Sequence, residues 1–154
     1  MASTTNLRLG DGASARPAAS WRPIETTTGD PAFSGVLQRD PMAGADVRRM
    51  VRAVLTAWEL LDLEDDVRLV STELVSNAAK HARGDVVRVT LTRTGLRRVR
   101  VAVTDRSRGE LVMRPVDEDS ESGRGLHLVR ALASRTGVVP LPWGKSVWAE
   151  VGTA

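Results

Sequence analysis

The stretch ELVSNAAKHA, residues 73–82, ends a segment whose apolar side chains recur at helical spacing. It places Asn77 in mid-helix, four residues after Glu73, although asparagine is a mediocre helix former because its amide competes for backbone hydrogen bonds. On a helical wheel these two residues lie with Lys80 and His81 beside the apolar arc, at the rim where a cleft would lie. A functional cleft and an ordinary solvated face with weak local pairing are both compatible with this pattern.

Apolar residues before this stretch recur at helical spacing, and those after it alternate with the two-residue period of a strand. An amphipathic helix covers ADVRRMVRAVLTAWELL (45–61). The second helix spans 64–82, with acidic residues in its first turn, where the helix dipole favours them. VVRVTLTR (86–93) and RVRVAVTD (98–105) alternate with period two and therefore predict a β-hairpin.

A third helix and two short strands complete the predicted domain, which covers residues 42–152. Gly123 opens the helix GRGLHLVRALAS, and the strands lie near 136–141 and 145–151. This order of elements predicts an α+β fold, a two-layer α/β sandwich with the helices on one face of a mixed, mostly antiparallel sheet.

The first part of the chain, residues 1–41, is rich in Ala, Ser, Thr, Gly and Pro and has no sustained period. This composition predicts a disordered N-terminal tail. Its only aromatic side chains are Trp21 and Phe33. Either of them is able to dock on the domain or on a partner, but a solvated tail is the preferred interpretation.

Composition narrows the classes of function. The chain of 154 residues suits one domain with an appendage, and its 42% hydrophobic content with only 3% aromatics predicts an aliphatic core. The absence of cysteine excludes disulfides and thiolate zinc sites. No apolar run resembles a signal peptide or a membrane span, so we expect a cytoplasmic protein without a membrane partner. The net charge is only +3 and the basic residues are scattered, so we expect no direct nucleic-acid binding.

Two further features indicate a ligand site. Asp105 continues the phase of the valines at 99–103, so its carboxylate ends the apolar face of a strand. Such a position is costly without hydrogen-bond donors, and the exocyclic amine of a base is a fitting one; a turn-capping aspartate is the alternative. The glycines of GRGL (123–126) would let a helix start approach phosphate, although short glycine pairs are common in loops. Together with the flank of residues 73–81, these features predict a nucleotide site.

Four motifs in this order carry a family resemblance: ELVSNAAKHA (73–82), TDRSRGE (104–110), GRGLHLVRALA (123–133) and GKSVWAEV (144–151). Through them the chain resembles the Bergerat-type ATP-binding domain shared by gyrase-type, chaperone-type and histidine-kinase ATPases. The likeness is strongest to the small single-domain anti-sigma-factor serine kinases, and among those to actinobacterial members. It covers about residues 43–151.

The resemblance implies residue roles in binding ATP and Mg²⁺. Asn77 would be the Mg²⁺ ligand through its amide oxygen, and Glu73 would be the general base that takes the proton from an attacking hydroxyl. Asp105 would accept a hydrogen bond from the adenine amine, with Ser146 supporting it through water. The other ATP-binding residues that the motifs imply are Lys80, His81, Ser107, Gly109, Gly123, Arg124, Gly125 and Leu126.

The resemblance also implies a regulatory function. It is that of an anti-sigma factor with serine/threonine protein kinase activity toward an anti-anti-sigma antagonist protein. The expected partners are a sigma factor, the antagonist, or both, and a homodimer is considered as well.

The sequence departs from the family pattern near the phosphates. Ser107 replaces the first glycine of the usual Asp-x-Gly-x-Gly, Glu121 stands where some kinase relatives have arginine, and residues 117–121 are almost all acidic. These departures keep open the alternative of an ATP-binding partner-switching module without kinase activity. A third hypothesis, independent of the departures, is a basic nucleic-acid binder without a nucleotide site.

Overall fold

The computed structural model describes residues 7–8, 20–81, 84–106 and 121–153, with the backbone alone at 7–8, 20, 81 and 121–124. The strands are β1 (Leu7–Arg8), β2 (Ser20–Ile24), β3 (Ala32–Gln38), β4 (Val86–Gly95), β5 (Arg97–Asp105), β6 (Arg135–Leu141) and β7 (Gly144–Thr153). The helices are α1 (Ala43–Ala57), the 3-10 helix η1 (Leu61–Leu63), α2 (Glu64–His81) and α3 (Glu121–Leu132).

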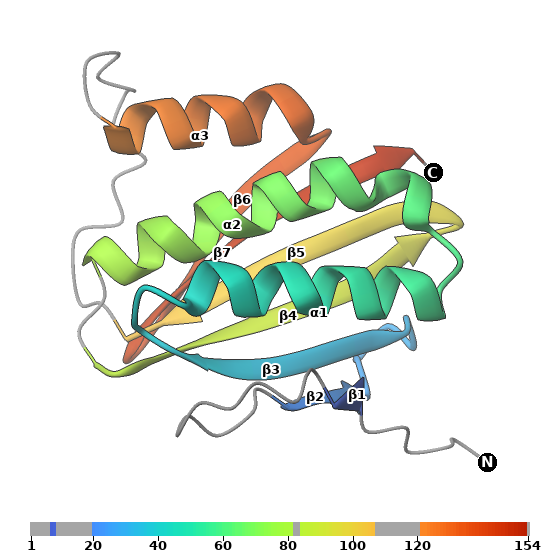
Figure 1. Cartoon of the computed structure of the whole chain (residues 1–154), viewed down its shortest axis with the longest axis horizontal. Coiled ribbons are helices and arrows are strands. Elements are labelled where there is room, and N and C mark those ends of the chain that lie inside the picture. The colour runs from blue at the N-terminus through green and yellow to red at the C-terminus, as the bar shows by residue number, and fades with distance from the viewer. Residues whose placement is uncertain (1–6, 9–19, 82–83, 107–120, 154) are drawn as a thin grey trace.

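The described strands form one seven-stranded sheet in the order β1-β2-β3-β4-β5-β7-β6. Every described pairing is antiparallel, so the sheet is more uniform than the mixed one that the sequence predicts. The helices α1, α2 and α3 lie over one face of it (Figure 1). The predicted α+β two-layer sandwich is therefore confirmed.

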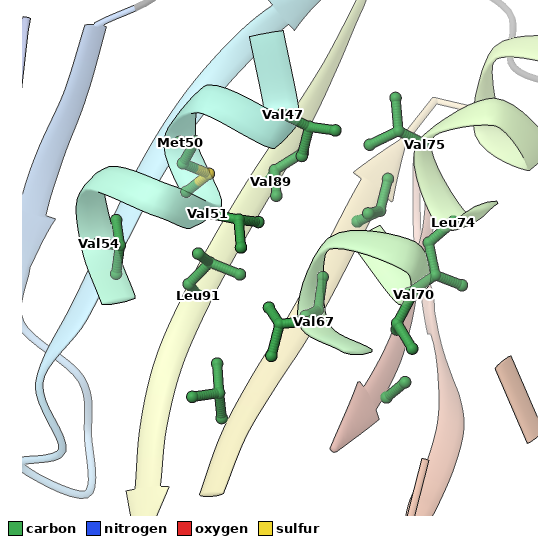
Figure 2. Packing of buried hydrophobic residues seen from close by; sticks show 14 of the residues in the cluster. Val47, Met50, Val51, Val54, Val67, Val70, Leu74, Val75, Val89 and Leu91 are labelled. Carbon is green, nitrogen blue, oxygen red and sulfur yellow. The ribbon is translucent and has the colours of Figure 1, made fainter. Parts of the chain in front are cut away.

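The core lies between the helices and the sheet and is almost wholly aliphatic. Helix α1 contacts β3 and β4, and α2 contacts β4, β5 and β7. The side chains that meet there include Val47, Met50, Val51 and Val54 of α1, Val67, Val70, Leu74 and Val75 of α2, and Val89 and Leu91 of β4 (Figure 2). Burying each such side chain stabilises the fold by about 1.5–3 kcal/mol. This packing fixes the orientation of α2, which carries the motif of residues 73–82.

The prediction of a disordered segment 1–41 is wrong for much of its length, because β2 and β3 belong to the sheet. Trp21 is fully buried, and its ring occupies the space that a Cβ at Gly35, its partner in register, would need. Phe33 packs against Trp58 with ring centroids 5.9 Å apart. Residues 20–38 are therefore part of the domain.

Element boundaries differ from the sequence-based ones in two places. Helix α1 ends at Ala57, because Glu59 adopts a positive φ of 58° that breaks the helix. Leu61, which the helical period places on the apolar stripe, is exposed in η1 instead. Helix α3 begins at Glu121, two residues before Gly123. The glycines of this motif therefore lie inside the first turns of α3.

None of the helices in the described part of the chain is long and apolar enough to cross a membrane.

Candidate functional site

The flank of α2 that faces α3 carries the polar residues of the ELVSNAAKHA motif. The neighbouring face of α2 turns Leu74 and Ala78 into the core. Glu73 and Asn77 lie at the edge of that face, are half-buried, and are one helical turn apart. Lys80 is exposed and lines a hollow beside the start of α1, together with Gly44 and Ser76. The carboxylate of Glu73 and the amide of Asn77 thus share one side of α2, and Lys80 lies between that side and α1.

Glu73 and Gly125 are brought together by the contact between α2 and α3. A Cβ at position 125 would overlap Oε2 of Glu73 and lie 3.3 Å from its Cδ. A side chain at position 125 would therefore displace the Glu73 carboxylate, whereas glycine lets α3 and this carboxylate lie side by side. The first turn of a helix carries free N–H groups and a partial positive charge, so the N-terminal part of α3 is a favourable neighbour for an anion.

Asp105 is the last residue of β5 and is only 2% exposed. The valines that precede it in phase, at 99, 101 and 103, are all buried beneath the helices. The expectation that this carboxylate ends the apolar face of the strand is confirmed, and β5 does not fray before it. Its partner in register on β7 is Lys145, which is half-buried on the same face.

Gly144 begins the GKSVWAEV motif, but the sequence did not predict its close contact with the backbone of Asp105. A Cβ at this position would overlap the carbonyl oxygen of Asp105 and lie 2.9 Å from its carbonyl carbon. Only glycine allows β7 to start this close to the end of β5. A glycine at the start of a strand is undistinguished by itself, so the GKSV motif alone did not predict this contact.

Ser146 is not brought to Asp105. It pairs in register with Thr104, on the opposite face of the sheet, where Oγ1 of Thr104 donates a hydrogen bond of 3.1 Å to its Oγ. Lys145 occupies the position opposite Asp105 instead. The family resemblance assigns Ser146 to the support of Asp105, but in this structure the residue opposite Asp105 is the one before it. A shift of one residue moves a side chain to the other face of a strand.

The C-terminal turns of α2 and the end of β5 lie at the same end of the domain. After α2 the chain enters β4, in which Arg88 pairs with Thr104, the residue before Asp105. A Cβ at Gly84 would lie 4.0 Å from Cδ of Arg106, so the segment that leads into β4 touches the residue after Asp105. The half-buried amide of Asn77 and the buried carboxylate of Asp105 thus belong to the same region.

The remaining predicted site residues are placed only in part. Leu126 is half-buried in α3. His81, Gly123 and Arg124 are described by their backbone alone, at the end of α2 and the start of α3. Ser107 and Gly109 lie outside the described residues, as does the acidic segment 117–120.

The donor set of the site fits Mg²⁺ bound together with a nucleotide. Magnesium usually keeps several waters and takes one or two protein ligands plus substrate phosphates. Within the described residues, no three or more His, Cys, Asp or Glu side chains gather to form a metal site of their own. Asn77, with one hard amide oxygen on a rigid helix, matches a metal held mainly by phosphates and water.

Comparison with known proteins places these elements in a family. A family model described as Histidine kinase-like ATPase domain matches residues 37–149, which include both helices and all strands of the site. No curated protein matches the sequence. Among solved structures, the chain is similar to the histidine kinase domain from Erythrobacter litoralis EL346 blue-light activated histidine kinase, with 22% sequence identity and a TM-score of 0.48. That similarity covers 70% of this chain and 59% of the other.

Proposed function

The chain belongs to the histidine kinase-like ATPase domain family, and on that premise we propose that α2, the end of β5 and the start of α3 form its ATP site. Membership of this family implies ATP binding in a regulatory role. The observation that carries the proposed location is the burial of Asp105 at the end of the domain that also holds Asn77. A carboxylate at the end of a strand is able to accept a hydrogen bond from a purine amine.

Each residue of the proposed site has a distinct task. The carboxylate of Asp105 accepts a hydrogen bond from the adenine amine, and Gly144 holds the backbone of Asp105 in place. Asn77 presents its amide oxygen to Mg²⁺. When bound, the metal offsets the negative charge of the phosphates. Lys80, exposed three residues after Asn77, attracts the phosphates by charge.

We propose that the chain acts as a serine/threonine kinase toward an anti-anti-sigma antagonist and that it binds a sigma factor, in the cytoplasm. The motif resemblance supports this assignment, as does the position of Glu73 one turn before Asn77. Glu73 would accept the proton of the attacking serine hydroxyl, which makes the oxygen a better nucleophile toward the terminal phosphate. A second copy of the chain is a further proposed partner.

One observation favours a second function, an ATP-binding partner switch without phosphoryl transfer. Oε2 of Glu73 lies directly against Gly125, so α3 covers part of the carboxylate and limits the access of an acceptor hydroxyl to it. A general base must come within hydrogen-bond reach of the proton that it removes. In the kinase function α3 therefore moves away from Glu73 when the acceptor binds.

Phosphate transfer separates these functions. The full chain is incubated with Mg-ATP labelled at the terminal phosphate and with a purified antagonist of the anti-anti-sigma class. The kinase proposal expects label on a serine of the antagonist, its loss in Glu73→Gln, and full retention in Asp66→Asn, an exposed acid in the first turn of α2. ATP binding without transfer in every protein would establish the partner switch. Transfer that survives Glu73→Gln would contradict the role of the general base.

A further inference from the structure

The face of the sheet that the helices leave uncovered is strongly basic, and we call it the open face. Strand register and burial place the following charged residues on it: Arg22 of β2, Arg88 of β4, Arg98 and Arg100 of β5, Arg135 of β6 and Glu150 of β7. Among the described strand residues on this face, Glu150 is the only carboxylate. The open face therefore carries five guanidinium groups against one acid, within a chain whose net charge is only +3.

One half of the open face is a fixed ion network around Glu150, which is 2% exposed. Arg100 and Thr94 donate hydrogen bonds of 2.8 and 3.0 Å to its two oxygens. Arg135 lies 3.2 Å and Arg98 3.7 Å from them. Three guanidinium groups thus share one carboxylate, so the network has a net charge of +2. These contacts also restrict the rotamers of the arginines.

The network also holds an aromatic ring. The guanidinium of Arg100 lies 4.2 Å and that of Arg135 5.7 Å from the centre of the Trp148 ring. A Cβ at Gly137 would lie 2.5 Å from that ring, so the indole lies flat over β6. Arginine and tryptophan held in this way are the residue types that contribute most to protein interfaces.

The other half of the open face is hollowed and mixes apolar with basic groups. A hollow of about 780 Å³ extends from this half to the end of β5, and it is lined by Val36, Gly84, Val86, Arg88, Thr104, Asp105, Arg106 and Trp143. The three apolar side chains are 42%, 42% and 49% exposed, although each is large enough to be stabilised by burial.

Arg88 lines this hollow, and Arg22 lies farther along the open face. Nη1 of Arg88 donates a hydrogen bond of 3.4 Å to Oγ of Ser34, and Arg22 is the partner of Ser34 in register on β2. The hollow thus combines three apolar side chains with the guanidinium groups of Arg88 and Arg106.

We propose that the open face docks an acidic, amphipathic segment of a partner protein. Carboxylates of the segment meet Arg88 at the hollow, Arg22 farther along the open face, and the surplus charge of the Glu150 network. Its apolar side chains enter the hollow between Val36 and Trp143. Two valines are poor contacts for phosphate or sugar, and the ring of Trp148 is already covered by arginine, so these residues fit a protein better than a nucleic acid. The hollow reaches Asp105 at the end of β5, but the charged and apolar side chains that carry the proposal lie on the open face, and the proposal does not depend on ATP binding.

Defined probes test the proposal on the full chain. A synthetic amphipathic helix of leucine and glutamate is compared with its leucine and lysine counterpart and with a short DNA duplex, by fluorescence anisotropy at two salt concentrations. The proposal expects binding of the acidic peptide that weakens with salt, and no binding of the basic one. Absence of acidic-peptide binding, or tighter binding of the duplex, would overturn it.

A pair of double variants with equal charge locates the binding surface. Arg22→Glu with Arg88→Glu reverses two charges of the open face, and Arg48→Glu with Arg49→Glu reverses two exposed charges on α1 in the other layer. We expect the first pair to weaken acidic-peptide binding by about tenfold or more and the second by less than about threefold. Equal losses of affinity in the two double variants would show that only the net charge of the chain matters, and would contradict the proposal.

A third variant covers the case in which the open-face pair fails to fold. Trp143→Ser removes an exposed ring from the hollow without changing charge, and we expect about a fivefold loss of acidic-peptide affinity. An unchanged affinity in this variant would contradict a docking site at the hollow. Self-association of the wild-type chain that the same variant abolishes would assign the face to a second copy instead.

Discussion

Asp105 and Glu150 are two carboxylates on neighbouring strands of one sheet, both 2% exposed, on opposite faces. Glu150 lies among arginines on the open face and receives hydrogen bonds from Arg100 and Thr94. Asp105 ends a run of buried valines on the helix-covered face, at the end of the domain that carries the ELVSNAAKHA motif. The two carboxylates are therefore equally buried, but Glu150 is surrounded by arginines and Asp105 follows apolar side chains.

The comparison teaches that burial alone does not mark a binding residue. Burial by itself would raise the pKa of Glu150, but the hydrogen bonds from Arg100 and Thr94 and the charges of Arg100 and Arg135 outweigh it and lower that pKa. Its charge is satisfied within the fold, as in a structural ion network. We propose that Asp105, at the end of an apolar strand face, is instead a residue that binds a ligand.

The substitution Asp105→Asn gives the largest expected effect. It keeps the shape of the side chain but turns an acceptor toward the adenine amine into a group that also donates. We expect the affinity for Mg-ATP to fall about 100-fold, or about 2.7 kcal/mol, with little change in stability. Equilibrium binding of a fluorescent ATP analogue measures it, and Glu150→Gln is the control, with expected affinity within about twofold of wild type. Equal losses of Mg-ATP affinity in the two variants would contradict the different roles assigned to Asp105 and Glu150.

Glu150→Gln is expected to affect stability instead. Without the carboxylate, three partly exposed arginines face one another, and the free energy of unfolding should fall by about 2 kcal/mol. Urea unfolding followed by tryptophan fluorescence provides the value. The matched control is Glu25→Gln, an exposed acid after β2, for which the change should stay within about 0.5 kcal/mol. A fully stable Glu150→Gln protein would show that the network contributes nothing to folding.

Acid should remove the contribution of Glu150. Its pKa is lower in the folded than in the unfolded chain, so its stabilisation is present above the unfolded pKa, about 4.3, and is lost as the pH falls through the folded value. The difference in Tm between wild type and Glu150→Gln should therefore be largest at neutral pH and shrink below about pH 4. Thermal scans across this range test it. A difference that stays constant with pH would contradict the ionised network.

The smallest effect is expected at Ser146. Because its hydroxyl bonds Thr104 on the open face, Ser146→Ala should change the affinity for Mg-ATP by less than about twofold. The family resemblance implies a larger loss, since it assigns Ser146 to the support of Asp105. Calorimetric titration of the variant decides between the register observed here and the motif.

Much of the fold follows from short-range patterns in the sequence. Helix α2 and the hairpin of β4 and β5 were predictable because their apolar residues keep a helical or a two-residue period. The burial of Asp105 followed from the same strand phase. The contact of Glu73 with Gly125 followed only in outline, because α3 lies about fifty residues along the chain and its packing angle is a tertiary property.

The missed features depend on long-range contacts. Pro23 and Gly35 interrupt any strand pattern in β2 and β3, and these strands are defined by their pairing and by Trp21 lying on Gly35. The need for glycine at 144 arises from the approach of Asp105, which lies about forty residues earlier in the chain. The position of Ser146 depends on the register of β7, and a shift of one residue moves a side chain to the other face.

Isothermal titration of the full chain with Mg-ATP tests the central claim most directly, namely that Asn77 and Asp105 belong to one nucleotide site. The account predicts binding to one site, weakened when Mg²⁺ is chelated, and a loss of this metal dependence in Asn77→Ala. Absence of heat at millimolar Mg-ATP, or binding that neither chelation nor this variant alters, would contradict it.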